Sequence, residues 1–403
     1  MGRHKEIMPS HFKKMEDRYI VKVVLISNYF NHHQKPFCDA MYQYIGYDFV
    51  FVTTSEMREE RKQMGYGMSE IPSYVVESKD SSVNLGFIDE ADVVIFGSAP
   101  EQMIKNRVRN KKIVFRYSER PLKKGNNLIK YFPRLFMWHR SNPMRAPIYL
   151  LCASAYTAVD YSNFGLFKNK TYQWGYFPQF RKHDILTLMQ KKKSNQILWC
   201  GRLIDWKHPD DVIQIARRLK EEGYDFSVTL IGLGIMEQPL RKMIDRYGLQ
   251  NEVLLPGAME PEQVRNRMEN AGIYLATSDY QEGWGAVVNE AMNSGCAVVA
   301  SHAMGSVPFM VKHGENGLVY ESGNIEMLYQ HVKTLLTFPQ QQVKLGTRAY
   351  YTIAEEWNAE IAAQRFLQMV NAIQEKGSCE LYQDGPCAPA KVIKNDWVKK
   401  IDR

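Results

Sequence analysis

The sequence predicts an α/β protein with two doubly wound units, each built around a parallel sheet. Three observations support this fold class. The chain has 403 residues, which suits two domains of about 150 to 200 residues each. Short runs rich in valine and isoleucine alternate with stretches of helical periodicity. A basic, polar stretch at 181–195 interrupts the alternation, and we expect the linker between the domains there.

The first half carries candidate buried strands, each a short apolar run bounded by turn residues. They are residues 22–27, 48–53, 92–97, 112–117 and 148–153. We expect these runs to form the sheet of an N-terminal domain at 1–185.

The second half repeats the pattern, with a helix expected at 209–222. Its candidate strands are residues 196–201, 227–232, 252–256, 272–277 and 297–301, followed by a turn and a further strand at 314–320. Helical patterns follow at 324–336 and 354–376, and a tail of irregular composition continues to residue 403. We expect the second domain at 195–355.

Composition narrows the class of protein. The chain is 45% hydrophobic and 24% charged, as in soluble globular proteins, and no apolar run approaches the ~18 residues of a transmembrane helix. Residues 1–18 lack the apolar core of a secretion signal, so we expect a cytoplasmic protein. The six cysteines form no Cys-x-x-Cys pair and are expected to be reduced and mostly buried.

The net charge of +8 is compatible with three kinds of anionic partner: nucleic acid, a membrane surface or small phosphorylated substrates. The excess is modest for this length, and the sequence shows no recognition helix, zinc finger or aromatic sheet signature. We therefore expect no nucleic-acid partner.

The strongest functional signal is a glycine-containing loop that leads into a predicted helix. It reads Gln281-Glu282-Gly283-Trp284-Gly285-Ala286-Val287 and continues through Glu290 to Gly295. The glycines let the backbone approach a ligand closely, and the helix start would aim free amides at an anion such as a phosphate ester. Glu282 and Glu290 could then meet two parts of an extended ligand. The alternative is that one carboxylate is a helix-start charge and the other lies on a solvated face.

A second motif places two cations, Arg202 and Lys207, in the loop after the first strand of the second domain. Arginine can bind a phosphate with two hydrogen bonds, and lysine supplies a compact charge, so the pair would stabilise a diphosphate leaving group. The alternative is two solvated loop cations.

The run 278–320 resembles the signature of the retaining glycosyltransferases of family 4, which carry a Glu-x7-Glu motif on a GT-B fold. The resemblance implies two Rossmann-like domains that face each other across a cleft. It also implies that a C-terminal helix crosses back, so that residues from about 360 to 403 complete the first domain. His208 stands where the family usually has glycine.

The resemblance assigns the donor site residue by residue. Glu290 would bind the nucleotide ribose, Glu282 would contact the donor sugar, and Arg202 and Lys207 would hold the diphosphate. The implied catalytic residues are Glu282, Arg202 and Lys207, and the implied donor-binding residues are Glu290, Gly283, Trp284, Gly285, Ala286, Val287, Gly234 and Met259.

The implied activity is transfer of a sugar, with retention of configuration, from a nucleoside diphosphate sugar to an acceptor hydroxyl. We expect UDP as the nucleotide, a glycan or lipid-linked acceptor in polysaccharide or glycolipid assembly, and neither a metal nor another cofactor. Two alternatives stay open. One is a sugar-nucleotide epimerase on the same fold, with Glu119 or His32 as base, and the other is a non-catalytic sugar-nucleotide-binding subunit.

The first domain departs most from the family pattern. A polar loop at 27–34 replaces the usual glycines, and the family's histidine after the fourth or fifth strand is absent. We take the polar residues at these two places as acceptor-side candidates: Asn31, His32, His33, Arg116 and Ser118.

The segment 119–145 interleaves basic residues with leucine, isoleucine and aromatic residues, and Glu119 is its only acidic residue. This pattern predicts peripheral contact with an anionic membrane, at its inner face for a cytoplasmic protein. The alternative is an ordinary helix whose apolar face packs on the first sheet, since Pro133 and Pro143 limit a long amphipathic helix.

Overall fold

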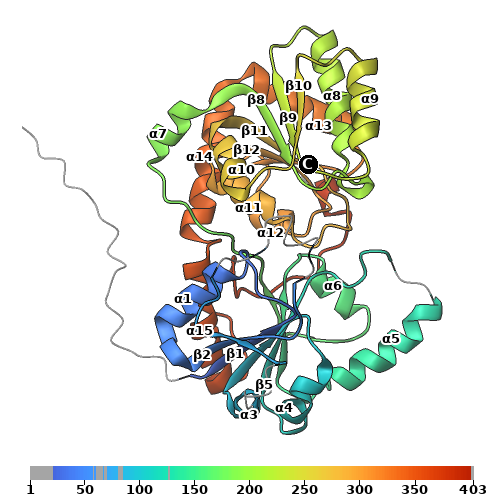
Figure 1. Cartoon of the computed structure of the whole chain (residues 1–403). Helices are drawn as coiled ribbons and strands as arrows, with labels where there is room; N and C mark the ends of the chain where they lie inside the picture. The colour runs from blue at the N-terminus through green and yellow to red at the C-terminus, as the bar shows by residue number, and fades with distance from the viewer. Residues whose placement is uncertain are drawn as a thin grey trace, which may run out of the picture.

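We describe the fold from a computed structural model, which covers residues 21–57, 59, 67, 70–79, 85–125 and 128–400. The N-terminal stretch, for which we predicted no secretion signal, lies outside these described residues. Two α/β units are stacked one above the other, and the chain crosses between them twice (Figure 1).

The first unit holds a seven-stranded parallel sheet in the order β3-β2-β1-β4-β5-β6-β7. Its strands are β1 (Val23–Ser27), β2 (Phe49–Thr53), β3 (Val75–Glu77), β4 (Val93–Phe96), β5 (Ile113–Ser118), β6 (Ile148–Cys152) and β7 (Thr171–Gln173). β1, β4 and β6 are buried at every position, as expected for strands covered on both faces.

The second unit holds a six-stranded parallel sheet in the order β10-β9-β8-β11-β12-β13. Its strands are β8 (Lys193–Cys200), β9 (Ser227–Ile231), β10 (Val253–Gly257), β11 (Ala271–Ala276), β12 (Ala297–Ser301) and β13 (Leu318–Tyr320). In the register of the central pair, Ile197 lies beside Ile273 and Leu198 beside Tyr274.

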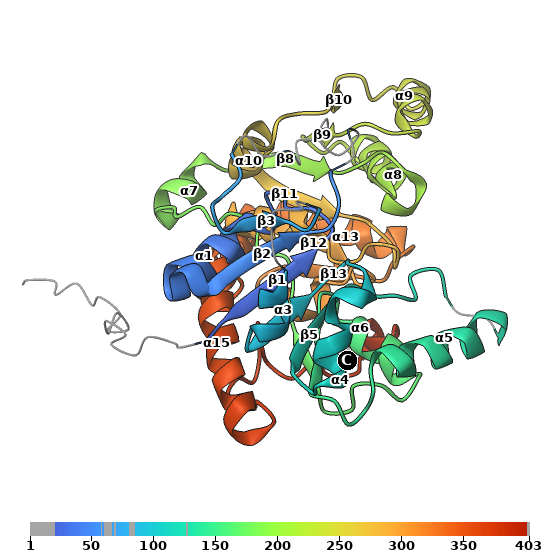
Figure 2. The ribbon, with the colours of Figure 1, turned by 60° about the horizontal axis from the view of Figure 1, so that its bottom comes forward.

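Helices cover both sheets (Figures 1 and 2). Those within the first unit are α1 (Lys35–Ile45), α3 (Gly86–Glu90), α4 (Lys105–Arg109), α5 (Leu128–Ser141) and α6 (Thr157–Ser162), with 3₁₀ turns η1 (Gly46–Asp48) and η3 (Glu101–Ile104). Those that follow are α7 (Ile185–Lys191), η4 (Asp205–Lys207), α8 (Pro209–Glu221), α9 (Glu237–Arg246), α10 (Pro261–Asn270), α11 (Ala286–Asn293), α12 (Val307–Met310), α13 (Ile325–Thr337), α14 (Pro339–Glu355), α15 (Ala359–Lys376) and η5 (Trp397–Lys400).

Both sheets have the strand order of a doubly wound fold, so each has a point at which the order reverses. This point lies between β1 and β4 in the first sheet and between β8 and β11 in the second. Ligands of open α/β sheets bind outside the carboxyl ends of the strands at such a point. The loops after β1, β8 and β11 are therefore where a ligand site is expected.

The prediction of two doubly wound α/β units is confirmed, but several elements were wrong or missing. The three-residue strands β3 and β7 were too short to give a periodic signal, and α14 was not predicted. The stretch predicted to be an irregular linker contains α7, because the carboxylate of Asp184 accepts a hydrogen bond from the amide of Thr187 at 2.8 Å and Leu188 is buried.

The end of the chain returns to the first unit. α15 packs beside α1, as the resemblance implied (Figure 1). The segment after α15 then runs along β7: the amide of Gln173 donates to the carbonyl of Ala388 at 2.7 Å, and the amide of Ala390 donates to that of Thr171 at 2.9 Å. This pairing covers the outer edge of the first sheet.

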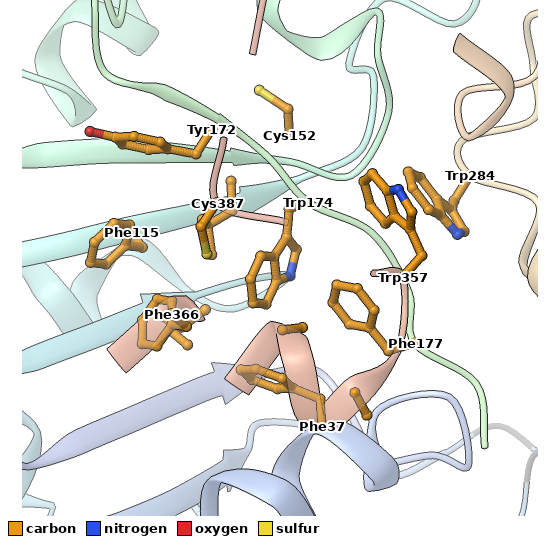
Figure 3. Close-up of a cluster of buried hydrophobic side chains, with 14 of the residues drawn as sticks. Phe37, Phe115, Cys152, Tyr172, Trp174, Phe177, Trp284, Trp357, Phe366 and Cys387 are labelled. Atoms are coloured by element: carbon orange, nitrogen blue, oxygen red, sulfur yellow. The ribbon is translucent and has the colours of Figure 1, made fainter. Parts of the chain in front are cut away.

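An aromatic cluster surrounds both crossings of the chain (Figure 3). Phe177 lies in the first crossing and Trp357 in the second. The Trp357 ring lies 6.4 Å from that of Phe177, 5.6 Å from that of Trp284 and 6.0 Å from that of Phe309. Because Trp284 and Phe309 belong to the second unit, these rings join the two units through a buried, apolar contact.

All six cysteines are free thiols, and five of them are buried, as predicted. Among the described helices, none combines the length and the apolar character that a membrane crossing needs.

Replacing Trp357 with alanine should lower the free energy of unfolding by about 3–5 kcal/mol, because it opens a cavity among rings from both units. Denaturant unfolding measures the change. Tyr351→Ala, at a position 41% exposed on α14, is the control and should cost less than about 1 kcal/mol. Equal losses in the two variants would contradict the role given to the cluster.

Candidate functional site

The loops after β8 and β11 are tied to each other at the switch point of the second sheet. The amide of Asp279 donates to the carbonyl of Trp206 at 2.9 Å. The hydroxyl of Thr277 donates to the carbonyl of Lys207 at 2.6 Å and accepts from the indole of Trp199 at 2.8 Å. These bonds hold the loop that carries the two cations against the loop that carries the first glutamate.

Lys207 and Glu282 form an ion pair between these loops. Nζ of Lys207 lies 2.5 Å from Oε2 of Glu282, which also accepts from the hydroxyl of Ser278 at 3.2 Å. The side chains are only 13% and 15% exposed. Burial by itself raises the pKa of Glu282, but the charge and hydrogen bond of Lys207, the charge of Lys123 and the bond from Ser278 together lower it. Glu282 is thus held as a carboxylate.

Arg202, the other cation of the motif, is exposed. Its guanidinium lies 5.5 Å from the ring centre of Trp206, and Nζ of Lys207 lies 5.1 Å from the same ring. The indole thus holds both positive charges near one another at the end of β8. This is an arrangement suited to a ligand with more than one negative charge.

The amino end of α11 faces the same place. Gly285 precedes the helix with φ of 85°, and no side chain caps the first turn. The amides of Ala286 and Val287 are the first of the helix, so they and the helix dipole offer an anion site. A Cβ at position 285 would meet Cε of Met304, the end of a flexible side chain, at 2.5 Å, so the turn favours glycine mainly for its positive φ.

Glu290, one and a half turns into α11, has a different environment from Glu282. Burial raises its pKa, and the charges of Arg265 and Arg181 oppose that effect only in part. The charged form of such a buried carboxylate is stabilised when a ligand donates hydrogen bonds to it.

Two more glycines make close backbone contacts under the cation loop. A Cβ on Gly234 would meet the carbonyl oxygen of Leu203 at 2.2 Å, and one on Gly232 would meet that of Gly201 at 1.8 Å. Gly234 therefore supports the loop through backbone packing. Met259, predicted to meet the nucleotide base, is half-buried at the end of β10.

The side chain of Trp284, a residue predicted to bind the donor, is buried away from solvent. Its side chain is 1% exposed, its indole donates to Asn289 at 2.8 Å, and a Cβ on Gly175 would overlap its ring at 2.3 Å. The ring belongs to the aromatic cluster, so only the backbone of Trp284 is left for a donor. The sequence alone could not predict that the ring is buried, because the aromatic residues around it lie far away in the chain.

The first unit contributes Glu119 to the site. A Cβ on Gly283 would meet the Glu119 carboxylate at 2.1 Å, so this carboxylate lies directly against the loop before α11. It accepts hydrogen bonds from Nζ of Lys123 at 2.5 Å and from the hydroxyl of Tyr176 at 2.9 Å. Sequence reasoning named Glu119 only as a possible base and missed Lys123, Tyr176 and Ser278, which have no motif of their own.

The polar loop after β1 is folded as a turn. The amide of His33 donates to the Asn31 side chain at 2.9 Å, and the rings of His32 and His33 lie 4.0 Å apart. Burial, and then the charge of His32, lower the pKa of His33 to about 3, and burial lowers the pKa of His32. Both imidazoles are therefore neutral at pH 7. The ring of His33 lies 6.4 Å from that of Tyr176, which places this loop near Glu119.

The other two acceptor-side candidates, Arg116 and Ser118, form their hydrogen bonds within the first unit. Arg116 is buried, forms two hydrogen bonds with the carboxylate of Glu101 at 2.6 and 2.9 Å, and donates to the carbonyl of Ser141 at 2.8 Å. The hydroxyl of Ser118 donates to the carbonyl of Glu119 at 2.7 Å. These contacts indicate that Arg116 stabilises the fold and that Ser118 shapes the turn carrying Glu119.

His208 adopts the conformation that glycine favours, with φ of 48° and ψ of 50°, at the start of α8. The loop thus keeps the left-handed turn despite the larger residue. Within the described residues, His208, Asp210 and Asp211 bring ligand atoms within 4.8 Å of one another and could hold a metal ion. Two acidic residues in the first turn of a helix are also explained by the helix dipole.

Comparison with known proteins agrees with this geometry in the second unit. Residues 184–352 match the family model described as glycosyl transferases group 1. The match runs from α7 into α14, and therefore includes Arg202, Lys207, Glu282 and Glu290.

Two relatives that match this region are glycosyltransferases by name. The chain is 23% identical over 184 residues to the putative colanic acid biosynthesis glycosyltransferase WcaL of Salmonella typhimurium, covering 44% of this chain and 45% of WcaL. It is 25% identical over 172 residues to the poly(ribitol-phosphate) α-N-acetylglucosaminyltransferase of Staphylococcus aureus, covering 43% and 34% of the two chains. The chain thus spans less than half the length of these relatives.

The likeness in structure extends over both units. HepE of Anabaena, solved in complex with UDP and glucose, superposes with a TM-score of 0.61 at 16% identity, over 87% of this chain and 100% of HepE. With glycosyltransferases of this architecture as its structural neighbours, the chain has the GT-B fold.

The pKa of Asp211 predicts a pH dependence of stability. Burial, and then the charge of Asp210, raise the pKa of Asp211 from 3.8 to about 6. Between these values the folded state binds more protons than the unfolded state, so stability falls as pH rises from about 4 to about 6.

Asp211→Asn should therefore be more stable than the wild type by roughly 1–3 kcal/mol at pH 7.5 and similar to it at pH 4. Asp48→Asn, at an exposed position in the first unit, is the control and should show no such gain. Urea unfolding at the two pH values tests this, and an equal gain at both would rule out titration of Asp211 as the cause.

Proposed function

We propose that this protein transfers a sugar from a UDP-sugar to an acceptor hydroxyl with retention of configuration, in the assembly of a polysaccharide or glycolipid. The observation that carries the proposal is the buried pair of Lys207 and Glu282 beside the uncapped start of α11. One small region thus offers a cation and free amides for a diphosphate and a fixed carboxylate for the sugar. The names of the matched relatives and the UDP complex of HepE support the same reading.

The diphosphate would lie between Arg202, Lys207 and the amides of Ala286 and Val287. These groups are positive or carry partial positive charge, and they stabilise the negative charge that develops as the bond between the sugar and the phosphate breaks. Arg202 is exposed and can move onto the ligand, whereas Lys207 is already held by Glu282.

The two glutamates would bind different parts of the donor. Burial raises the pKa of Glu290, and nearby positive charges oppose this effect only in part. The carboxylate of Glu290 would therefore be stabilised by accepting hydrogen bonds from the ribose hydroxyls. Glu282, on the loop before α11, would orient the donor sugar, and Lys207 would link that carboxylate to the diphosphate.

Transfer would follow a front-face route. The acceptor oxygen bonds to the anomeric carbon on the face from which the diphosphate departs, and the acceptor's proton passes to the departing phosphate oxygen. The same configuration results. No metal is required by this scheme, since side chains and amides neutralise the diphosphate; excess chelator should leave the rate unchanged.

An epimerase remains the second candidate, because Glu119 lies against Gly283 and is held there by Lys123 and Tyr176. A carboxylate at this point could face the sugar ring. Incubation with labelled UDP-sugars distinguishes the candidates: a glycosylated acceptor with released UDP indicates transfer, an isomeric UDP-sugar indicates epimerisation, and neither product indicates a binding subunit.

Arg202→Ala and Lys207→Ala should each lower turnover by about 100-fold or more, because each removes a charge that acts on the departing diphosphate. Lys242→Ala, an exposed cation on α9, is the control and should keep normal turnover. Thermal unfolding should accompany the assay, since Lys207→Ala also leaves the Glu282 carboxylate without its partner. Near-normal turnover in either variant would remove that residue from the mechanism.

Glu290→Ala should weaken binding of UDP by roughly 10- to 100-fold, the value of losing hydrogen bonds to a charged group. Glu282→Gln, which keeps an oxygen that can accept from Lys207, should leave UDP binding within about threefold of the wild type and abolish most of the sugar transfer, because its proposed partner is the sugar. Isothermal titration calorimetry with UDP, beside a transfer assay, tests the division. Equal loss of UDP affinity in both variants would show that the glutamates do not have separate partners.

A further inference from the structure

α5 has two apolar faces, and only one of them packs on the protein. Its inner face carries Tyr131, Leu135 and Trp138. Tyr131 stacks on Phe164 at 4.8 Å, and the Trp138 ring lies 4.7 Å from Phe164 and 4.9 Å from Tyr161. These contacts account for how the helix is attached to the first unit. The alternative to membrane contact was a helix that packs on the first unit by an apolar face. These contacts show that α5 does pack on the first unit by one of its apolar faces.

The second face is apolar and open to solvent. Ile129, Phe132, Phe136 and Met137 follow one another at helical spacing and are 85%, 66%, 70% and 56% exposed. Met144, just beyond the helix, is 70% exposed. We call these five residues the outer face of α5. The helix projects from the body of the molecule in both views, so this face meets no other described element (Figures 1 and 2).

Positive charge surrounds the outer face. From Arg120 to Val159 the sequence contains no aspartate or glutamate. The cations of α5 and its two ends that are exposed to solvent are Lys124, Lys130, Arg140 and Arg145. An apolar stripe rimmed by cations, on a helix held away from the protein body, is the pattern of a helix that lies in a membrane interface.

We propose that the outer face of α5 docks this protein peripherally on an anionic lipid bilayer. The apolar side chains enter the boundary between headgroups and acyl chains, and the surrounding cations contact the acidic headgroups. The positive charge around the outer face favours an anionic bilayer over a second copy of the chain as the partner. A second copy of this face would bring two sets of cations together, whereas an anionic bilayer is complementary to both the charge and the apolar stripe.

The position of α5 connects this surface with the candidate site. β5 ends at Ser118, the next residue is Glu119 against the loop before α11, and nine residues later the chain enters α5. One continuous segment of the first unit thus carries both the carboxylate at the loop before α11 and the outer face. This link to a lipid-linked acceptor rests on the proposed function, but docking itself does not.

Flotation of the full-length protein with phosphatidylglycerol-containing vesicles and with pure phosphatidylcholine vesicles tests the proposal. We expect binding to the anionic vesicles at low salt, at least about tenfold less on the neutral ones, and release as ionic strength rises toward 1 M, where screening is nearly complete. No substrate is present, so failure to float is distinct from failure of sugar transfer.

Variants identify the face. The pair Phe132→Ser and Phe136→Ser should reduce binding at least tenfold, and so should the pair Arg140→Glu and Arg145→Glu. Matched controls are Leu186→Ser with Leu381→Ser, which are exposed apolar residues elsewhere, and Lys344→Glu with Arg348→Glu on α14. The controls should bind as the wild type does, and all variants should keep the wild-type melting temperature.

Three results would overturn the proposal. The first is absence of binding to anionic vesicles at low salt. The second is equal binding by the outer-face variants and the controls. The third is a wild-type dimer that the outer-face serines convert to a monomer, which would assign the face to a second copy of the chain.

Discussion

The ion pair of Lys207 and Glu282 is the contact on which the arrangement of the site depends. Each residue stands on a loop after a central strand of the second sheet, and each is mostly withdrawn from solvent. A charge in such a place is stable only with a partner, so either residue alone would be costly to bury. The pair therefore fixes the distance between the two loops, and the bonds of Thr277 and Asp279 reinforce it.

The two units approach each other through positions that have no side chain. Gly283 makes room for the carboxylate of Glu119, Gly175 makes room for the ring of Trp284, and a Cβ on Gly305 would meet the hydroxyl oxygen of Ser154 at 2.4 Å. The amide of Ala155 in turn donates to the carbonyl of Gly305 at 2.8 Å. Backbone contacts of this kind bring chemistry from the first unit onto the loop before α11, which the motifs of the second unit alone do not reveal.

The sequence was informative where the signal was local. Buried parallel strands such as β1 and β12 are continuous apolar runs, so apolar content alone found them, and the start of α11 at Ala286 followed from its glycines. Arg202, Lys207 and Glu282 could be named because each lies just after a strand. The substitutions at these three positions test the roles proposed for them.

What depended on distant contacts could not be predicted. β7 has three residues and exists because β6 and the chain's end flank it. The sequence around Trp284 predicts a contact with a ligand, whereas in the folded chain its side chain lies in the core. The same holds for Lys123, whose sequence neighbours suggest only a basic surface but whose charge reaches both Glu119 and Glu282.

The segment after α15 has a practical consequence for anyone who engineers this chain. Besides covering β7, it places Trp397, whose indole donates to the hydroxyl of Tyr156 at 2.9 Å. It also places the carbonyl of Asn395 3.0 Å from Nε2 of His302 and 3.4 Å from the hydroxyl of Tyr280, two residues before Glu282. A shortened C-terminus would thus both expose a sheet edge and remove contacts behind the loop that carries Glu282.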